Sequence, residues 1–336
     1  MTESTVAPPI PGLAAQHQGA VEGAAFAERP DLGRLLIAGK DAADLLHRLS
    51  TNAVKSLLPG QGTATVFTTS KGRILDLVTL HRLPEGFLAH LAIERVKPLA
   101  DWIERYTFRE AVSVADWSAS HRTATLVGPR ADAVATRVAG DGAAALAPHG
   151  VMAFEAGSHA AWLARTFPMA GGGYLVTAPV GSWVAVRAAL LDDQAGGVIE
   201  IDAHGLELLR LAAGLPAPGR ELTEEFNPWE ARLGDAIALD KGCYVGQEVI
   251  ARLNTYRKVS KFLVRFAIAG DPPAAGATVR RGDEAIGAIT SAAALPGGGR
   301  SIALGYVRDE DAVAGVAVTI DAPGGSLPAT IEGVAR

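Results

Sequence analysis

The sequence predicts an α+β protein built from more than one domain. Strand-like and helix-like apolar patterns alternate along residues 33–191, which is typical of α+β domains. After Phe262 the apolar runs become short and are separated by Gly/Pro turns, which indicates a small all-β barrel or sandwich. The length of 336 residues also exceeds that of a single typical domain.

The first part of the chain contains clear strand and helix patterns. The expected elements are, in order, a strand at 33–39, a helix that begins at Lys40, a hairpin of strands at 63–69 and 74–80, a strand at 87–93 and a helix at 96–106. Three leucines share the apolar face of the helix from Lys40, namely Leu45, Leu46 and Leu49. A second unit begins near residue 122 and ends with a helix at 183–191.

These patterns divide the chain into a tail and three domains. Residues 1–22 are rich in Pro, Ala and Gly, so we expect a mobile tail there. The expected division continues with a first α+β domain at 23–118, completed by 200–257, a second α+β domain at 119–199 and a β-barrel at 258–336.

Composition excludes several functional classes. The net charge of −5 argues against a broad nucleic-acid-binding face, so direct binding of nucleic acid is not expected. The single cysteine, Cys243, forms no internal disulfide and supplies no four-thiolate metal site, and the eight histidines are scattered, so no intrinsic metal is expected. No basic leader and no run of about 20 apolar residues is present, which favours a cytoplasmic protein without a membrane segment.

The densest group of reactive side chains lies at residues 240–252. This run combines a thiol, an ammonium group, a phenol, an amide, a carboxylate and a guanidinium group. A helix that begins near Gln247 would direct its positive N-terminal end toward Cys243, and Lys241 would also favour a thiolate. The alternative interpretation is a buried cysteine on a glycine-kinked loop whose charged neighbours are solvated.

The run KGCYVGQE at 241–248 resembles the signature of the YgfZ family, which belongs to the superfamily of the glycine-cleavage T-protein aminomethyltransferases. The resemblance covers nearly the whole chain. Its other parts are the strand and helix at 35–52, the SKGRILDL hairpin at 70–77, the approach at 221–228 and two barrel strands at 287–291 and 302–307.

The resemblance implies a three-domain ring of two ferredoxin-like α+β domains and a C-terminal β-barrel around a central folate channel. It implies binding of tetrahydrofolate or a derivative, a role in the assembly or repair of iron–sulfur clusters in client proteins, and a link to tRNA modification. The residues that it assigns to the folate site are Lys241, Gly242, Tyr244, Gly246, Gln247, Glu248, Arg252 and Asn52.

Two further residues are candidates for chemistry. The resemblance gives Cys243 the role of a reactive thiol, and it places Asp76 at the position of the catalytic aspartate of the enzymes. An aspartate in a hairpin also has a simpler explanation, because its carboxylate often caps its own turn.

The chain departs from the aminomethyltransferases at three positions. Gly171 stands where the enzymes carry a glutamate that contacts folate, Leu206 replaces an arginine, and Ala212 replaces the glutamate of the R-L-E-A-G motif. These losses disfavour aminomethyl transfer, because each removes a polar partner for a buried ligand. Three hypotheses remain: a folate-binding accessory protein, a folate-dependent aminomethyltransferase or other one-carbon transferase, and a non-catalytic interaction module.

Overall fold

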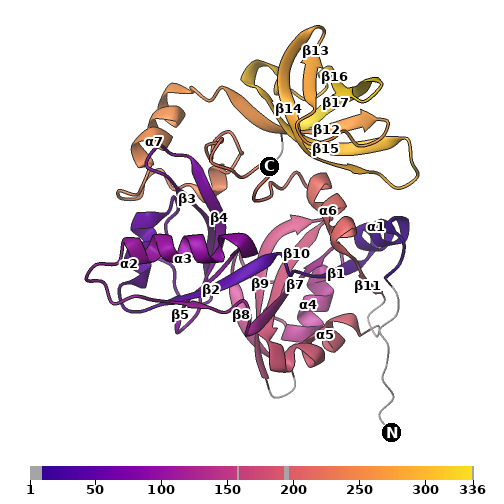
Figure 1. Ribbon diagram of the computed structural model, residues 1–336. Helices are drawn as coiled ribbons and strands as arrows, with labels where there is room; N and C mark the ends of the chain where they lie inside the picture. Colours follow the sequence, from indigo (N-terminus) through magenta and orange to yellow (C-terminus); the bar gives the residue numbers. More distant parts are fainter. Residues whose placement is uncertain (1–9, 157–158, 193–196, 335–336) are drawn as a thin grey trace.

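Two open β-sheets and a closed β-barrel make up the protein, as the computed structural model shows (Figure 1). The structure describes residues 10–156, 159–192 and 197–334. This architecture confirms the predicted α+β class and the C-terminal barrel. No helix in these ranges is long and apolar enough to cross a membrane.

The first sheet has five strands in the order β3-β4-β5-β2-β6. Helices α2 and α3 cover one face and bury Leu45, Leu49 and Ile103 against it. The elements of this unit are β2 (Leu32–Ala38), α2 (Ala42–Leu49), β3 (Gly62–Thr68), β4 (Ile74–Arg82), β5 (Gly86–Ala92), η1 (Ile93–Arg95), α3 (Val96–Arg105) and β6 (Ser113–Asp116). All the strands and helices expected between residues 33 and 106 are present.

The second sheet has six strands in the order β11-β1-β7-β10-β9-β8. Its elements are β1 (Ala24–Glu28), β7 (His121–Val127), α4 (Ala131–Ala139), β8 (Val151–Ala156), β9 (His159–Met169), β10 (Gly172–Pro179), η2 (Val180–Ser182), α5 (Trp183–Leu191) and β11 (Val198–Glu200). Tyr174 and Phe26 are fully buried in the core of this unit.

The two units repeat one topology. In each, a strand and a helix precede a three-stranded meander, and a second helix leads to a last strand, so that β7-α4-β8-β9-β10-α5-β11 repeats β2-α2-β3-β4-β5-α3-β6. The second sheet differs because β1 lies between β7 and β11. Strand β1 is antiparallel to β7 and parallel to β11.

The N-terminal region differs from the expected tail and from the expected first domain. Residues Leu13–Glu22 form helix α1, and the buried Gln16 side chain accepts a hydrogen bond from the Asp202 amide at 3.0 Å. Strand β1 then joins the second sheet rather than the first. Small buried residues such as Ala20 and Ala25 allow this close packing, but an alanine-rich segment gives little periodic signal in the sequence. Residues 1–9 of the expected tail lie outside the described ranges.

The barrel closes in the order β12-β15-β14-β13-β16-β17. Its strands are β12 (Lys261–Ala269), β13 (Thr278–Arg281), β14 (Glu284–Ala294), β15 (Arg300–Arg308), β16 (Ala317–Ala322) and β17 (Gly325–Val334), and η5 (Asp309–Asp311) follows β15. The segment between the second sheet and the barrel carries α6 (Ala203–Ala212), η4 (Gly234–Ala236) and α7 (Gln247–Tyr256).

A buried ionic network joins the barrel to this connecting segment. The Glu221 side chain is fully buried and accepts hydrogen bonds from Thr290 and Ser291 of β14, each at 2.6 Å. Its other oxygen lies 3.1 Å from the guanidinium group of Arg210 on α6, which also pairs with Glu207 at 2.7 Å. The barrel is therefore fixed to α6 through a carboxylate that has no access to water.

Candidate functional site

The KGCYVGQE segment and the hairpin turn at 69–73 pack against each other. Gly246 adopts a left-handed conformation (φ 83°), and a β-carbon there would lie 2.6 Å from the Thr69 carbonyl oxygen. Gly72 faces Val249 of α7 from the hairpin side. Thr68 donates a hydrogen bond to the Val245 carbonyl at 2.7 Å. Two motifs that are far apart in the sequence thus form one surface because glycine lets the backbones approach.

Lys241 closes the C-terminal end of α2. Its ammonium group donates hydrogen bonds to three backbone carbonyls, those of His47 and Ser50 at 2.5 Å and that of Asn52 at 2.8 Å. A positive charge at a helix C-terminus stabilises the orphan carbonyls and the negative end of the helix dipole. Burial lowers the pKa of Lys241 to about 8. Because the three carbonyls accept from all three N–H groups of the ammonium, none of these donors is directed to a ligand.

Tyr244 holds the same segment in place through apolar packing. Its ring is buried with Ile237 and Ile250, and Trp229 packs at the edge of this cluster. The Trp229 indole N–H donates to the Ile250 carbonyl at 2.9 Å. Burial raises the pKa of Tyr244 to about 12, so its hydroxyl stays protonated at neutral pH.

Cys243 is exposed, which excludes the alternative of a buried cysteine. Its neighbour Gly242 is exposed as well, and a β-carbon at Gly242 would meet no atom within 4 Å. Helix α7 begins at Gln247, as the sequence predicts, and Glu248 and Arg252 on it are exposed. The segment therefore presents its reactive groups on a surface that the half-buried Lys241 and the buried Tyr244 hold in place.

The Asn52 side chain is hydrogen-bonded to other parts of the protein. Its side-chain amide donates to the Thr63 hydroxyl and to the Ala64 carbonyl, each at 2.9 Å, and to the Asp235 carbonyl at 3.1 Å. The side-chain oxygen of Asn52 accepts a hydrogen bond from the Ala53 backbone amide at 2.8 Å. The side chain is thus engaged in holding the loop after α2 to β3 and to η4.

Asp76 is the most unusual carboxylate of the first unit. It lies on β4, only 2% of its surface is exposed, and neither carboxylate oxygen has a hydrogen-bond partner among the described residues. Burial raises the pKa of Asp76 to about 7, although the charge of Arg95 and the nearby Leu77 amide oppose the shift. Because its oxygens are unpaired, the carboxylate does not cap its own turn.

Two buried donors that the sequence did not indicate lie in the same unit as Asp76. The Trp102 indole N–H on α3 and the Arg95 Nε atom have no hydrogen-bond partner among the described residues. Buried polar groups are nearly always paired in native proteins, so unpaired groups of this kind mark a binding site or strain. No sequence pattern distinguishes an unpaired tryptophan from one in a core.

Gly171 and Leu206, where the resemblance to the enzymes leads us to expect polar residues, both lack a polar side chain. Gly171 lies in the turn between β9 and β10 with φ 107° and offers no side chain. Leu206 on α6 packs against an apolar cluster that contains Met169, Ile201 and Leu209. The replacement of polar residues is therefore accompanied by apolar packing.

The described part of the chain contains no group of three or more His, Cys, Asp or Glu side chains that would hold a metal ion. It does contain two cavities, and Asp76 lines neither of them. One, of about 660 Å³, lies beside α7 and the start of the barrel, where Trp229, Arg232 and Arg257 contribute to its wall. The other, of about 240 Å³, lies between the two α+β units.

Residues 9–241 match the GCVT N-terminal domain, and residues 261–334 match the glycine cleavage T-protein C-terminal barrel domain. The chain belongs to the glycine cleavage T-protein family. The two matches leave residues 242–260 between them, which include Cys243 and α7. The family assignment agrees with the order of the units, because the two sheets precede the barrel.

Similar proteins carry transferase names. An aminomethyltransferase of Rubrobacter xylanophilus is 32% identical over 89% of this chain and 80% of its own length. A chloroplastic protein of Arabidopsis thaliana, provisionally named a transferase, is 30% identical over 86% of this chain, which spans 66% of that protein. The crystal structure of aminomethyltransferase T from Bartonella henselae superposes with a TM-score of 0.82 at 21% identity, covering 96% of this chain and 88% of that one. This last match shows a shared fold.

Tetrahydrofolate is the cofactor that this family uses, and the residues of this chain fit it in part. The unpaired carboxylate of Asp76 and the unpaired N–H group of Trp102 suit a ligand that carries both donors and acceptors. Gly171 has no side chain and Leu206 lies against an apolar cluster, so neither position supplies a polar contact for such a ligand.

Substitution of Gly246 by alanine tests the packing of the two motifs. We expect Gly246→Ala to reduce the free energy of unfolding by about 2–4 kcal/mol, because the residue is left-handed and its new β-carbon would meet backbone at 2.6 Å. Gly242→Ala is the matched control, since its β-carbon would enter open space, and it should change stability by less than about 0.5 kcal/mol. Equal losses in the two variants, measured by chemical denaturation, would contradict this interpretation.

Proposed function

We propose that the protein is a tetrahydrofolate-binding accessory protein of the YgfZ type, which supports the assembly or repair of iron–sulfur clusters in client proteins. The observation that carries the proposal is that the chain combines a buried carboxylate without hydrogen-bond partners, Asp76, with an exposed thiol, Cys243. The first suits a buried folate, and the second suits a reaction with a partner at the surface.

Asp76 is the proposed folate contact. A buried carboxylate without partners is costly unless a ligand with N–H groups accompanies it. A pKa of about 7 also allows Asp76 to accept and release a proton at neutral pH. Bound tetrahydrofolate would supply a nitrogen that carries one-carbon groups, and Asp76 would hold or move a proton beside it.

Cys243 is proposed as the group that meets the client. It stands on a segment fixed by Lys241 and Tyr244, and the N-terminus of α7 lies four residues further on. The other residues proposed to contact folate or the client from this surface are Gly242, Gly246, Gln247, Glu248 and Arg252, whereas the Asn52 side chain holds the loop after α2 in place.

A transferase is the second candidate function. The names of the aminomethyltransferase relatives and the carboxylate of Asp76 favour it. The apolar environment of Leu206 and the missing side chain at Gly171 oppose aminomethyl transfer. An assay for methylenetetrahydrofolate formed from an aminomethyl-lipoyl carrier distinguishes the two, and a rate comparable to that of a true T-protein would establish the transferase.

Calorimetric titration with tetrahydrofolate tests the ligand. We expect micromolar binding, equivalent to about −8 kcal/mol, and at least about tenfold weaker binding by Asp76→Asn, because the amide presents an N–H group where the carboxylate accepts. Cys243→Ser should bind folate as the native protein does, since the thiol is exposed. No heat and no thermal stabilisation at millimolar folate would exclude the ligand.

The proposed role of the thiol is tested in cells that lack this protein. Cys243→Ser should fold with a loss of at most about 1–2 kcal/mol, yet fail to restore the activity of iron–sulfur enzymes. Full restoration by the variant would remove the thiol from the mechanism.

A further inference from the structure

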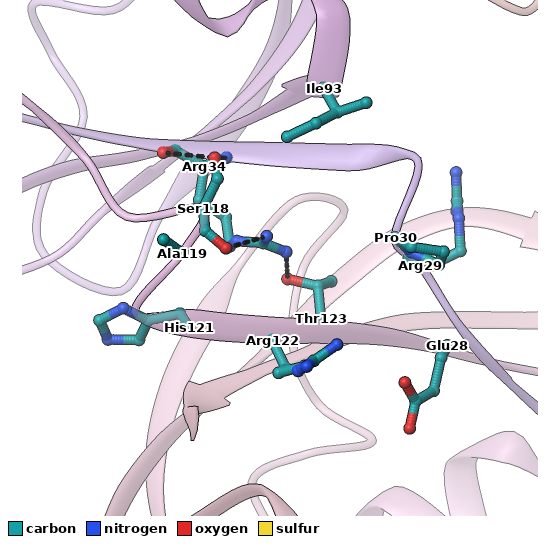
Figure 2. Close-up of a pocket in the computed structure, with 10 residues that line it drawn as sticks. All are labelled: Glu28, Arg29, Pro30, Arg34, Ile93, Ser118, Ala119, His121, Arg122 and Thr123. Carbon is teal, nitrogen blue, oxygen red and sulfur yellow. Dashed lines mark hydrogen bonds between the residues drawn. The ribbon is translucent and has the colours of Figure 1, made fainter. Parts of the chain in front are cut away.

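A small pocket lies where the two α+β units meet, and neither Asp76 nor Cys243 lines it. Its volume is about 240 Å³, and its wall includes Arg34 from β2 and residues 121–123 at the start of β7. Figure 2 shows the Arg34 side chain reaching across to Thr123, with His121 and Arg122 on the same strand.

Arg34 is a buried cation that has no ion pair among the described residues. Only 5% of its surface is exposed, and its Nε atom has no hydrogen-bond partner in these ranges. Its other contacts are neutral: Nη1 donates to the Thr123 hydroxyl at 3.0 Å, and Nη2 donates to the Ser118 carbonyl at 2.9 Å. Burial lowers the pKa of Arg34, and the more distant charge of Asp116 only partly opposes the shift. A buried guanidinium group ordinarily has a carboxylate or another anion directly beside it.

The other charges around the pocket leave a positive excess. Arg29 pairs with Asp31 at 2.6 Å, and Glu28 lies 3.7 Å from Arg187. Arg122 is exposed, and within the described ranges it has no ion pair with an acidic side chain. The positive charge of Arg122 also lowers the pKa of Arg34. Arg34 and Arg122 are thus two like charges near one cavity, and neither is directly paired with a described carboxylate.

The remaining wall limits what enters. The His121 ring stacks on Trp117 with centroids 4.3 Å apart, and its Nδ1 atom is paired with the Ser120 hydroxyl at 2.9 Å. Burial lowers the pKa of His121, so the ring is neutral at pH 7 and adds no charge. Pockets for drug-sized ligands are about 300–1,000 Å³, so a cavity of about 240 Å³ suits one small anionic group.

We propose that this pocket binds a small oxyanion, either a phosphate or a carboxylate group, through the guanidinium groups of Arg34 and Arg122. Guanidinium groups present paired N–H donors that match the oxygens of both groups. The anion would neutralise the buried charge and hold β2 of the first sheet to β7 of the second. None of the residues proposed to contact folate lines this pocket.

The test is a calorimetric titration of the full chain with inorganic phosphate and, separately, with glutarate, at constant ionic strength. We expect saturable binding of one of the two probes and a matching rise in melting temperature. Arg122→Ala should weaken this binding at least about tenfold while the protein stays folded, because Arg122 is exposed. Arg300→Ala is the control, an exposed arginine at the start of β15 on the barrel, and should bind as the native protein does.

The outcomes separate the two ligand groups from a purely structural role. Preferential binding of phosphate assigns a phosphate site, and preferential binding of glutarate assigns a carboxylate site. If Arg34 only connects the two sheets, neither probe will bind in the millimolar range, or Arg122→Ala will bind as tightly as the native protein. Either result overturns the proposed anion site. Neither result bears on folate binding, which is measured in a separate titration.

Discussion

Asp76→Asn is expected to stabilise the protein at pH 8 by up to about 4 kcal/mol and to have almost no effect at pH 4. Burial raises the pKa of Asp76 from 3.8 to about 7, and each tenfold change in proton affinity on folding corresponds to about 1.4 kcal/mol. The unfolded chain releases this proton near pH 4, whereas the folded protein retains it to about pH 7. The stability of the native protein therefore falls as pH rises through this window.

An asparagine has no charge to bury, so the variant does not lose this stability. The measurement is the free energy of unfolding of both proteins by chemical denaturation between pH 4 and pH 8, with free folate absent. Asp101→Asn is the control, because Asp101 is an exposed carboxylate on α3, and it should follow the native curve. A variant that is no more stable than the native protein at pH 8 would show that a charge on Asp76 is tolerated.

The difference between the two proteins is the informative quantity, because other groups titrate in the same range. Burial lowers the pKa of His81 to about 4. The folded protein therefore loses stability as pH falls from about 6.5 toward 4, which is opposite in sign to the effect of Asp76. His81 is common to both proteins, so its contribution cancels in the comparison.

Stabilisation by Asp76→Asn combined with weaker folate binding would show that the protein retains a destabilising carboxylate for its ligand. Sites that bind or react often reduce stability in this way. If the variant became more stable and bound tetrahydrofolate equally well, Asp76 would be a strained residue without a role in binding.

Glu221→Ala is expected to reduce the free energy of unfolding by about 3–5 kcal/mol, because it leaves the Arg210 charge and the donors of Thr290 and Ser291 without their buried partner. The loss should appear first as release of the barrel from α6, since this carboxylate joins them. Glu332→Ala is the control, because the ion pair of Glu332 with Arg265 on the barrel is partly exposed and is worth at most about 1 kcal/mol.

Chemical denaturation gives the magnitude, and hydrogen exchange of the barrel amides shows where the protein opens. Glu221→Gln should lie between the alanine variant and the native protein, since an amide keeps the hydroxyl contacts but not the ion pair. Equal stability of Glu221→Ala and Glu332→Ala would show that the barrel is held by apolar contacts such as the stacked rings of Phe226 and Tyr306.

Local patterns in the sequence determined the regular elements of this protein. The hairpin at 63–80, the helix from Gln247 and the barrel after Phe262 were predictable because each has its own periodicity or turn residues. The run KGCYVGQE also indicated the correct superfamily. These features depend on neighbours in the chain.

Only the tertiary structure decided how these parts act on one another. Strand β1 enters the second sheet, Lys241 binds the end of α2 rather than a ligand, and Arg34 lies buried without a directly paired anion among the described residues. In each case the partner is distant in the sequence, and the energy depends on whether water reaches the group. Asp76 is the clearest example. The sequence around it is compatible both with a carboxylate that caps a hairpin turn and with one that is buried. Burial, which only the tertiary structure shows, raises its pKa to about 7.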